Sequence, residues 1–289
     1  MAERALLIVN PRAGKRTASD RDLPECVKLL TEAGFEVETV ETGRVHDAAE
    51  LAEHGKRDGF RAIFVAGGDG TVALAAKPLL DSGVTLGVLP FGSYMNIANG
   101  LGIPLTPIDA ARVIARREVK RCDVGEVDGR SVFFETAGVG LDADAFGAAR
   151  LMERQRWTAA FRRVRRWATA SPRSVELVID GAKTRHDVMQ VLVVNSPFYA
   201  WALPLVPRAD MTDGVLEIAV FPRMGRRQLV RSLVELALQG RPGTPPLLKR
   251  GRVIEISSSD PLAVHADGQI AGRLPVTVRC RAGALRVFA

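Results

Sequence analysis

The chain has few of the residues and segments that mark secreted or membrane-spanning proteins. Its 289 residues include three cysteines, Cys26, Cys122 and Cys280, which lie far apart and without metal-ligand spacing. So few cysteines exclude a disulfide framework and favour a reducing compartment. No run of about 18 apolar residues occurs, which excludes a membrane-spanning helix. The N-terminus lacks the apolar core of a signal peptide, so we expect a cytoplasmic protein.

Acidic residues are also in deficit, with 33 Asp and Glu against 40 Lys and Arg, a formal net charge of +7. A basic chain suggests an anionic partner, which could be nucleic acid, acidic lipid or a phosphorylated substrate. The alternative is a solvated, arginine-rich surface without a partner. The remaining composition, 47% hydrophobic and 25% charged, is typical of one large globular domain or two of average size.

The first part of the chain alternates strand and helix patterns. Strands are predicted at 5–9, 35–40, 62–65 and 85–89, and helices at 22–33, 47–55, 72–80 and 108–116. Such alternation favours a Rossmann-like parallel sheet with helices on both faces, and ligands at the carboxyl ends of its strands.

After about Cys122 the pattern changes to short β-like runs bounded by Gly, Asp-Gly and Pro turns. These runs are 123–127, 131–136, 175–179, 188–195, 215–221, 253–257 and 275–279, with helical segments inserted at about 143–169 and 228–238. The pattern predicts a mainly antiparallel β-sandwich or barrel. We therefore expect an α/β domain at 1–122 and a β-sandwich domain at 123–289, whose last residues could pack back on the first domain.

The most informative segment is Val65-Ala-Gly-Gly-Asp-Gly-Thr71, which joins a predicted strand to a predicted helix. Glycines let a backbone approach a polyphosphate closely, and the first N–H groups and the dipole of a helix favour negative charge. The carboxylate of Asp69 would repel phosphates. It fits if a divalent cation lies between them, or if Asp69 caps the helix.

Several further motifs occur in order along the chain. They are Asn10-Pro-Arg-Ala-Gly14, Gly67 to Thr71, Gly87 to Ser93 continuing to Leu101-Gly-Ile-Pro104, Gly138-Val-Gly-Leu-Asp142, Asp213-Gly-Val-Leu216 and Asp267-Gly268-Gln269. Together these motifs resemble the diacylglycerol kinase catalytic-domain family, which includes bacterial soluble lipid kinases and the sphingosine and ceramide kinases. The resemblance implies an ATP-binding α/β domain like those of NAD kinase and phosphofructokinase, followed by a β-sandwich, with ATP in the cleft between them. It also implies Mg²⁺.

The resemblance carries nucleotide-binding roles to one set of residues. This set is Asn10, Gly14, Lys15, Thr42, Gly67, Gly68, Asp69, Gly70, Thr71, Gly92 and Ser93. The glycines would offer N–H groups, Thr71 and Ser93 hydroxyls, and Lys15 a cation. A solvated basic turn at Lys15 and a plain Asn-Pro strand end at Asn10 stay open as alternatives.

Catalysis is assigned to Asp267, Gln269 and Asp69. The family has Glu where this chain has Gln269, and an amide cannot accept a proton. Asp267 then remains as the carboxylate that could remove a proton from the acceptor hydroxyl, unless it is only part of an Asp-Gly hairpin turn. His265, two residues earlier, could assist or be an ordinary surface histidine.

The chain departs from the family at further positions. The third motif usually reads Gly-Thr-x-Asn-Asp, whereas here Ser93, Met95 and Asn96 replace Thr, Asn and Asp, and Leu74 stands where a Glu is common. These departures leave the implied fold intact. They raise a second hypothesis, a protein that binds nucleotide or lipid without phosphoryl transfer.

A metal and a membrane are the remaining partners considered. Asp213, with Asp210 nearby, could hold a Mg²⁺ ion, as the matching position does in related bacterial kinases, or could simply form a turn. The segment 150–173 alternates arginines with apolar residues at helical spacing, typical of peripheral contact with an anionic membrane but also of a helix packed on its own domain. The apolar loop 196–206 could line an acyl-chain entrance or belong to the core.

The leading hypothesis is therefore an ATP- and Mg²⁺-dependent kinase that phosphorylates a hydroxyl of diacylglycerol, a sphingoid base or ceramide. A kinase for a soluble substrate is a third hypothesis. Nucleic-acid binding is disfavoured because the aromatics follow a helical stripe rather than a stacking sheet. The residues indicate no protein partner and leave a homodimer open.

Overall fold

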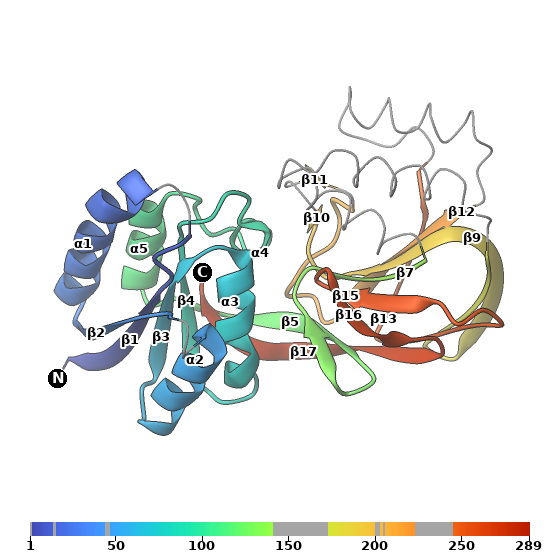
Figure 1. Cartoon of the computed structure of the whole chain (residues 1–289), viewed down its shortest axis with the longest axis horizontal. Coiled ribbons are helices and arrows are strands. Elements are labelled where there is room, and N and C mark those ends of the chain that lie inside the picture. Colours follow the sequence, from blue (N-terminus) through green and yellow to red (C-terminus); the bar gives the residue numbers. More distant parts are fainter. Residues whose placement is uncertain are drawn as a thin grey trace. The chain divides into compact units, whose positions relative to one another are not determined.

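The computed structural model describes residues 2–13, 16–43, 47–140, 173–199, 203–204, 206–222 and 245–289. The chain divides into two compact units, shown in Figure 1. The first unit comprises Met1–Val124, Met211–Asp213 and Ala282–Ala289, and the second comprises Gly125–Asp210 and Gly214–Arg281.

The first unit alternates strands and helices. Its elements are β1 (Glu3–Val9), α1 (Arg16–Glu32), β2 (Phe35–Glu41), α2 (Ala48–Arg57), β3 (Ala62–Gly67), α3 (Asp69–Ala76), the 3-10 helix η1 (Lys77–Leu79), β4 (Thr85–Pro90), α4 (Asn96–Gly100), α5 (Pro107–Ala115) and the start of β5 (Val119–Val127). The strands run parallel in the order β2-β1-β3-β4, and the end of β17 (Val276–Phe288) pairs in parallel with β4. Helices α1 and α5 pack together, as do α2 and α3, on opposite faces of the sheet (Figure 1).

Burial explains why this sheet forms. Strands β3 and β4 are buried along their whole length, as is β1 from Ala5 onward, because helices cover both faces. The rings of Phe35, Phe64 and Phe288 pack edge to face or tilted, with centroids 5.1 to 6.1 Å apart. Since Phe288 lies at the end of β17, the last residues of the chain form part of this core.

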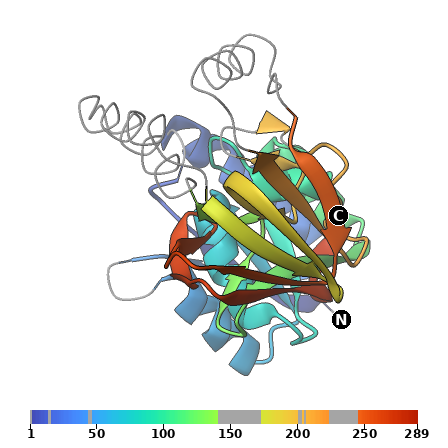
Figure 2. The same ribbon diagram turned by 90° about the vertical axis from the view of Figure 1, so that its right-hand side faces the viewer.

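The second unit is antiparallel. Its elements are the remainder of β5, β6 (Ser131–Phe133), β7 (Thr136–Gly140), β8 (Arg173–Ile179), β9 (Ala182–Val194), β10 (Phe198–Tyr199), β11 (Leu203–Pro204), β12 (Leu216–Pro222), β13 (Leu247–Gly251), β14 (Val253–Ser258), β15 (Ala263–Ala266), β16 (Gln269–Arg273) and most of β17. The long strand β9 pairs with β8 through its first half and with β7 and β12 through its second half. Figure 2 shows the later strands of this unit, from β8 onward, side by side in yellow to red.

Alternate residues of these strands form one apolar core. It contains Ala137 and Val139 of β7, Val191 and Val193 of β9, and Val264 and Ala266 of β15, together with residues of β8, β12, β14 and β17. A smaller cluster on the other face of β9 and β12 joins Leu192, Val194 and Ala219 to Val206 and Ala209. The two faces of the sheet thus have separate packing partners.

The predicted fold class, parallel strands first and antiparallel strands later, is confirmed in outline. Some elements differ from expectation: the run 131–136 is two strands separated by a bend, and α4, β13, β15 and β16 were not predicted. These elements are four to five residues long, too short to show a period. The helices predicted at 143–169 and 228–238 lie outside the described residues.

An ion pair anchors the loop before β12. Glu217, whose side chain is 4% exposed, accepts from Arg208 Nη2 at 2.6 Å and lies 3.5 Å from Arg250 Nε. A buried carboxylate needs such partners because leaving it unpaired costs several kcal/mol. The pair thereby fixes the segment that leads into Asp210 and Asp213.

We expect Arg208→Met to lower the free energy of unfolding by about 2 kcal/mol, because among the described residues Glu217 then keeps the longer contact to Arg250 alone. The double variant Arg208→Met/Glu217→Met should recover most of that loss. Urea unfolding measures both. Arg4→Met, which breaks the exposed Arg4–Glu38 pair, is the control and should cost less than about 0.5 kcal/mol. A double variant no more stable than Arg208→Met would contradict the assignment.

Candidate functional site

The glycine-rich turn lies at the carboxyl edge of the parallel sheet. β3 ends at Gly67 and α3 begins at Asp69, with Gly68 as its N-cap residue in extended conformation. A Cβ on Gly67 would lie 2.7 Å from Thr71 Cβ, and one on Gly92 would lie 2.6 Å from Gly68 Cα. The loops after β3 and β4 therefore approach so closely that only glycine fits at Gly68 and Gly92. The backbone N–H groups of both loops are thus brought together.

Gly70 differs from these glycines. It is exposed, it lies in the first turn of α3, and nothing lies within 4 Å of the place where a Cβ would stand. The first turn of a helix is also where N–H groups lack intrahelical partners. The protein therefore has room for a side chain here, and the same space is available to an anion.

Asn10 and Thr71, predicted as nucleotide contacts, are brought together. Asn10 follows β1, and its Nδ2 donates to Thr71 Oγ1 at 2.8 Å, while its Oδ1 accepts from the backbone N of Arg12 at 3.0 Å. β1 and β3 are neighbours in the parallel sheet, so their ends meet at the same edge. The Thr71 hydroxyl accepts from Asn10 and keeps its own proton to donate.

Thr42 and Ser93 lie on loops of the same sheet edge. The backbone N of Thr42, just after β2, donates to Val9 O at 2.8 Å. Ser93 is exposed on the loop between β4 and α4. Gly14 and Lys15 lie outside the described residues. The nucleotide-binding roles of all these positions remain predictions.

Asp69 does not cap its own helix, so that alternative was wrong. Its Oδ1 accepts from the backbone N of Ile97 at 3.0 Å, at the start of α4. Burial raises the pKa of the Asp69 carboxyl, and hydrogen bonds from backbone N–H groups around Met95 to Ile97 partly oppose that rise. The carboxylate thus joins the loop after β3 to the loop after β4.

Met95 has a left-handed conformation just before α4. Its φ is 50° and ψ 47°, and its side chain is buried, with Sδ 2.7 Å from the place of a Cβ on Gly92. Left-handed backbone is unfavourable for a residue such as Met. Surrounding contacts, including the Asp69–Ile97 bond, therefore hold this turn in place.

Asp267 has the same geometry as two other Asp-Gly turns of the second unit. Asp128, Asp180 and Asp267 have φ of 50°, 47° and 45°, and each precedes a glycine of positive φ. Asp128 accepts from Thr277 N, and Asp180 accepts from Arg252 N and Val253 N. The turn alternative is therefore correct for the backbone at Asp267.

The carboxylate of Asp267 holds the link between β6 and β7. Its Oδ2 accepts from Phe134 N at 2.7 Å, and its Oδ1 accepts from Glu135 N and Thr136 N, both at 3.0 Å. Three N–H donors stabilise the ionised form and fix its direction. These bonds give Asp267 a structural role, and its predicted catalytic role is untested.

The neighbours of Asp267 differ in exposure. Gln269, the first residue of β16, is exposed. His265 is 9% exposed within β15, so the surface alternative for this histidine was wrong. It pairs with Gly138 of β7 on one side and with Ile270 of β16 on the other.

Asp210 and Asp213, the predicted metal ligands, are both exposed on the loop before β12. Within the described ranges, no group of three or more His, Cys, Asp or Glu side chains is placed to hold a metal ion. A cation at Asp213 would therefore need backbone carbonyls or water as further ligands. Oxygen donors of this kind suit Mg²⁺, and the site remains a prediction.

A buried carboxylate beside the loop of the predicted metal ligands was not predicted. Asp123 of β5 is 2% exposed, its Oδ1 accepts from Gly283 N at 2.6 Å, and its backbone N donates to Met211 O at 2.6 Å. It joins the residues before Asp213 to the returning strand β17. The signal was present in the sequence, since Asp123 interrupts the apolar run Cys122 to Val124.

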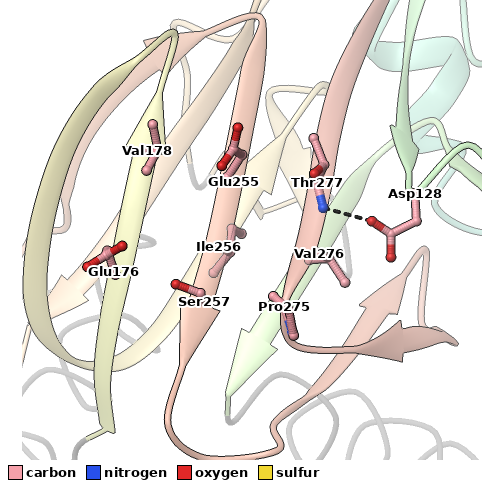
Figure 3. A pocket seen from close by; sticks show the side chains of 9 residues that line it. All are labelled: Asp128, Glu176, Val178, Glu255, Ile256, Ser257, Pro275, Val276 and Thr277. Carbon is pink, nitrogen blue, oxygen red and sulfur yellow. Dashed lines mark hydrogen bonds between the residues drawn. The ribbon is translucent and has the colours of Figure 1, made fainter.

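A shallow hollow of about 200 Å³ lies in the second unit, away from these motifs (Figure 3). Asp128, Glu176 and Glu255 are among its lining residues, and Thr277 N donates to Asp128 across it. Lys183 pairs with Glu176 at 2.8 Å. No residue predicted for the site lines this hollow.

The predicted membrane elements mostly lie outside the described residues. These are the segment 150–173, except Arg173, and part of the loop 196–206. Among the helices that are described, none combines the length and apolar character needed to span a membrane.

We expect Asp69→Ala to lower the free energy of unfolding at pH 7 by about 1 kcal/mol, because Ile97 N loses its acceptor, whereas Asp69→Asn keeps an acceptor oxygen. A raised pKa means that the folded state holds the proton more tightly than the unfolded state. The wild type should therefore lose stability relative to Asp69→Asn as pH rises from about 4, the carboxyl's ordinary range. Urea unfolding from pH 3.5 to 8 measures the difference in free energy of unfolding between the wild type and Asp69→Asn. A difference that does not change with pH would contradict the raised pKa of Asp69.

Comparison with known proteins agrees with this architecture. The model of the diacylglycerol kinase catalytic domain matches residues 4–127, and that of the YegS C-terminal NAD kinase β-sandwich-like domain matches 135–289. The chain is 27% identical to a diacylglycerol kinase of Bacillus subtilis (strain 168), over 94% of this chain and 92% of that one, and 26% identical to a diacylglycerol kinase of Staphylococcus aureus (strain JH9), over 95% and 89%. The crystal structure of a diacylglycerol kinase from Bacillus anthracis str. Sterne has the same fold, with TM-score 0.78, 24% identity and coverage of 99% and 96%. The chain therefore belongs to the diacylglycerol kinase catalytic-domain family.

Proposed function

We propose that this protein is an ATP- and Mg²⁺-dependent lipid kinase, which transfers the γ-phosphate to a hydroxyl of diacylglycerol or a related lipid such as a sphingoid base or ceramide. The observation that carries the proposal is the pair of glycine loops joined through Asp69 in a chain whose relatives, matched over nearly their full length, are diacylglycerol kinases. Its net charge of +7 supports work in the cytoplasm at an anionic membrane surface.

Phosphoryl transfer depends mainly on positioning and on neutralising charge. In this proposal the first turn of α3 at Gly70 and the loop at Gly92 and Ser93 donate N–H groups to the phosphates. Thr71 donates its hydroxyl proton, since its oxygen already accepts from Asn10. Mg²⁺, when bound, would supply the charge that lets phosphates lie near Asp69.

A second candidate is a protein that binds nucleotide and lipid without transfer. It is favoured by the three backbone bonds of Asp267 and by Gln269, because neither residue then offers a free basic oxygen. The two candidates share the nucleotide site and differ in turnover.

The test is transfer of labelled phosphate from ATP, with Mg²⁺, to diacylglycerol, ceramide and sphingosine in anionic mixed micelles. A new labelled lipid, identified by chromatography and absent with Asp69→Ala, is the expected result. Saturable ATP binding without any labelled lipid would favour the second candidate. Labelling of a soluble acceptor without lipid or detergent would favour a soluble-substrate kinase.

We expect Gly70→Ala to separate folding from nucleotide binding. The new methyl group meets no protein atom within 4 Å, and Ala is the better helix former, so the free energy of unfolding should hold or rise by about 0.5 kcal/mol. The same methyl group would obstruct a phosphate at the first turn, and ATP affinity should fall at least about tenfold, a cost of about 1.4 kcal/mol. Calorimetric titration with ATP measures this. Gly92→Ala is the comparison variant: its new methyl group would collide with Gly68, so both the stability of the protein and its ATP affinity should fall. Unchanged ATP affinity in Gly70→Ala would show that the first turn of α3 is not part of the nucleotide site.

A further inference from the structure

A basic side chain and two polar ones lie at one end of the apolar core of the second unit. They are Lys249 of β13 and Thr184 and His186 of β9. The residues paired directly with them on neighbouring strands all belong to that core; these are Ile218, Leu177 and Val175. Directly paired residues of antiparallel strands share a face, so Lys249, Thr184 and His186 lie on the inward faces of their strands.

The three side chains are linked through one hydroxyl group. Lys249 Nζ donates to Thr184 Oγ1 at 3.0 Å, and His186 Nε2 lies 3.1 Å from the same oxygen. Burial lowers the pKa of His186, and the positive charge of Lys249 lowers it further. All three residues are half-buried, so a solute can reach them. An ammonium group and an imidazole are thus held close together, on either side of one hydroxyl.

The charge of Lys249 is not balanced by a carboxylate among the residues that the structure describes. Each carboxylate of the adjoining strands β8 and β12 has another partner. Glu176 pairs with Lys183 on the outward face of the sheet, where Glu176 also lines the shallow hollow of Figure 3. Glu217 pairs with Arg208. A partly buried ammonium group without a counter-charge is unfavourable, and a bound anion would remove that cost.

A phosphate group suits this set of donors. An ammonium group has three N–H donors, and Lys249 uses one of them on Thr184. Hydrogen bonds from ammonium and imidazolium groups to phosphate oxygens are short and strong because both partners are charged. Leu247, two residues before Lys249 and therefore on the same face, is 48% exposed. An apolar surface beside the cation also suits a phosphate that is attached to a lipid.

We propose that Lys249, Thr184 and His186 form a binding site for a phosphate group, which is shared by free phosphate and by lipid headgroups. Lys249 supplies the charge, Thr184 a hydroxyl, and His186 a second cation once it is protonated. The site lies wholly within the second unit. Binding to it can be measured without ATP or an acceptor lipid, so the inference is tested separately from the proposed function.

The pH dependence follows from the groups that face His186. Among the described residues, Lys249 is the charged group on that face, since the facing residues of β8 and β12 are apolar. Asp187 and Arg185 lie on the outward face of β9. The lowered pKa leaves the imidazole neutral at pH 7. A bound anion favours the imidazolium, so binding takes up a proton, and anion affinity should rise as pH falls from about 7.5 to about 6.

The experiment titrates the whole chain with inorganic phosphate and with sulfate by calorimetry. Sulfate is the probe for pH dependence because its own charge stays constant over this range. The imidazole of His186 is followed by NMR, and its signal is assigned by its loss in His186→Gln. We expect saturable binding of both anions, a higher pKa of His186 when sulfate is present, and sulfate affinity about threefold greater at pH 6 than at pH 7.5.

A matched pair of variants separates this site from general charge attraction. Lys249→Met should lower sulfate affinity at least about tenfold without lowering the thermal unfolding temperature, because methionine is apolar and lies at the edge of the core. Lys183→Met removes the same charge from the outward face of β9 and should keep the wild-type affinity. Lys249→Arg, which keeps the charge, should retain most of the binding.

Vesicles distinguish the two sources of phosphate. Phosphatidylcholine vesicles containing phosphatidic acid are sedimented with the wild type, Lys249→Met and Lys183→Met. The net charge of +7 favours any anionic vesicle, so the informative comparison is between the two variants. Weaker sedimentation of Lys249→Met than of Lys183→Met assigns the site to lipid headgroups. Equal sedimentation, together with phosphate binding that Lys249→Met has lost, assigns it to soluble phosphate.

Three results would overturn the inference. The first is the absence of saturable phosphate and sulfate binding by the wild type, a measurement that needs no variant to fold. The second is equal sulfate affinity in Lys249→Met and Lys183→Met. The third is a pKa of His186 that sulfate does not raise. None of these depends on kinase activity, because no ATP is present.

Discussion

The hydrogen bond from Ile97 N to the Asp69 carboxylate is the interaction on which the geometry of the first unit's site depends. It joins the loops after two neighbouring strands, β3 and β4. Those loops already approach to the limit that glycine allows at Gly68 and Gly92. Burial raises the pKa of the Asp69 carboxyl, which means that burying its ionised form costs free energy. A carboxylate is therefore an unfavourable group with which to link the two loops. The arrangement is understandable if the charge also serves phosphate chemistry, since an amide could make the same bond without the cost.

The second unit uses carboxylates differently. Three Asp-Gly turns with left-handed aspartates each direct a carboxylate to backbone N–H groups of another strand. The chemistry is the same at Asp128 and Asp180, which no motif singles out, and at Asp267, which a motif does. A motif match therefore identifies where a family has its site, whereas the hydrogen bonds decide what the side chain is free to do there.

Much of the fold could be predicted because its cause is local. Strands such as β3 and β4 are continuous apolar runs, and their alternation with helices implies a parallel sheet whose loops meet at one edge. The proximity of Asn10 and Thr71 follows from that topology. By contrast, α4 is a five-residue helix that follows Met95 in left-handed conformation, and Asp69, 28 residues before Ile97, stabilises its start. The local sequence therefore contains no pattern that predicts this helix.

The antiparallel unit was harder to predict for a related reason. Whether His265 is on the surface or buried depends on the register of β15 against β7, and one residue of slip would turn it to the other face. The same register decides that Thr136 is buried. The sequence of the four-residue strand β15 does not show which residues face the core, because so short a segment is compatible with either choice of buried face.

The departures from the family pattern are consistent with one another when viewed by unit. In the first unit, the buried side chain of Met95 lies against Gly92, and buried Asn96 is the first residue of α4, so both substitutions lie in the packed turn between β4 and α4. In the second unit Gln269 is exposed and cannot be explained by packing. Its effect is chemical, the loss of a proton acceptor, so this departure bears on the reaction rather than on the fold.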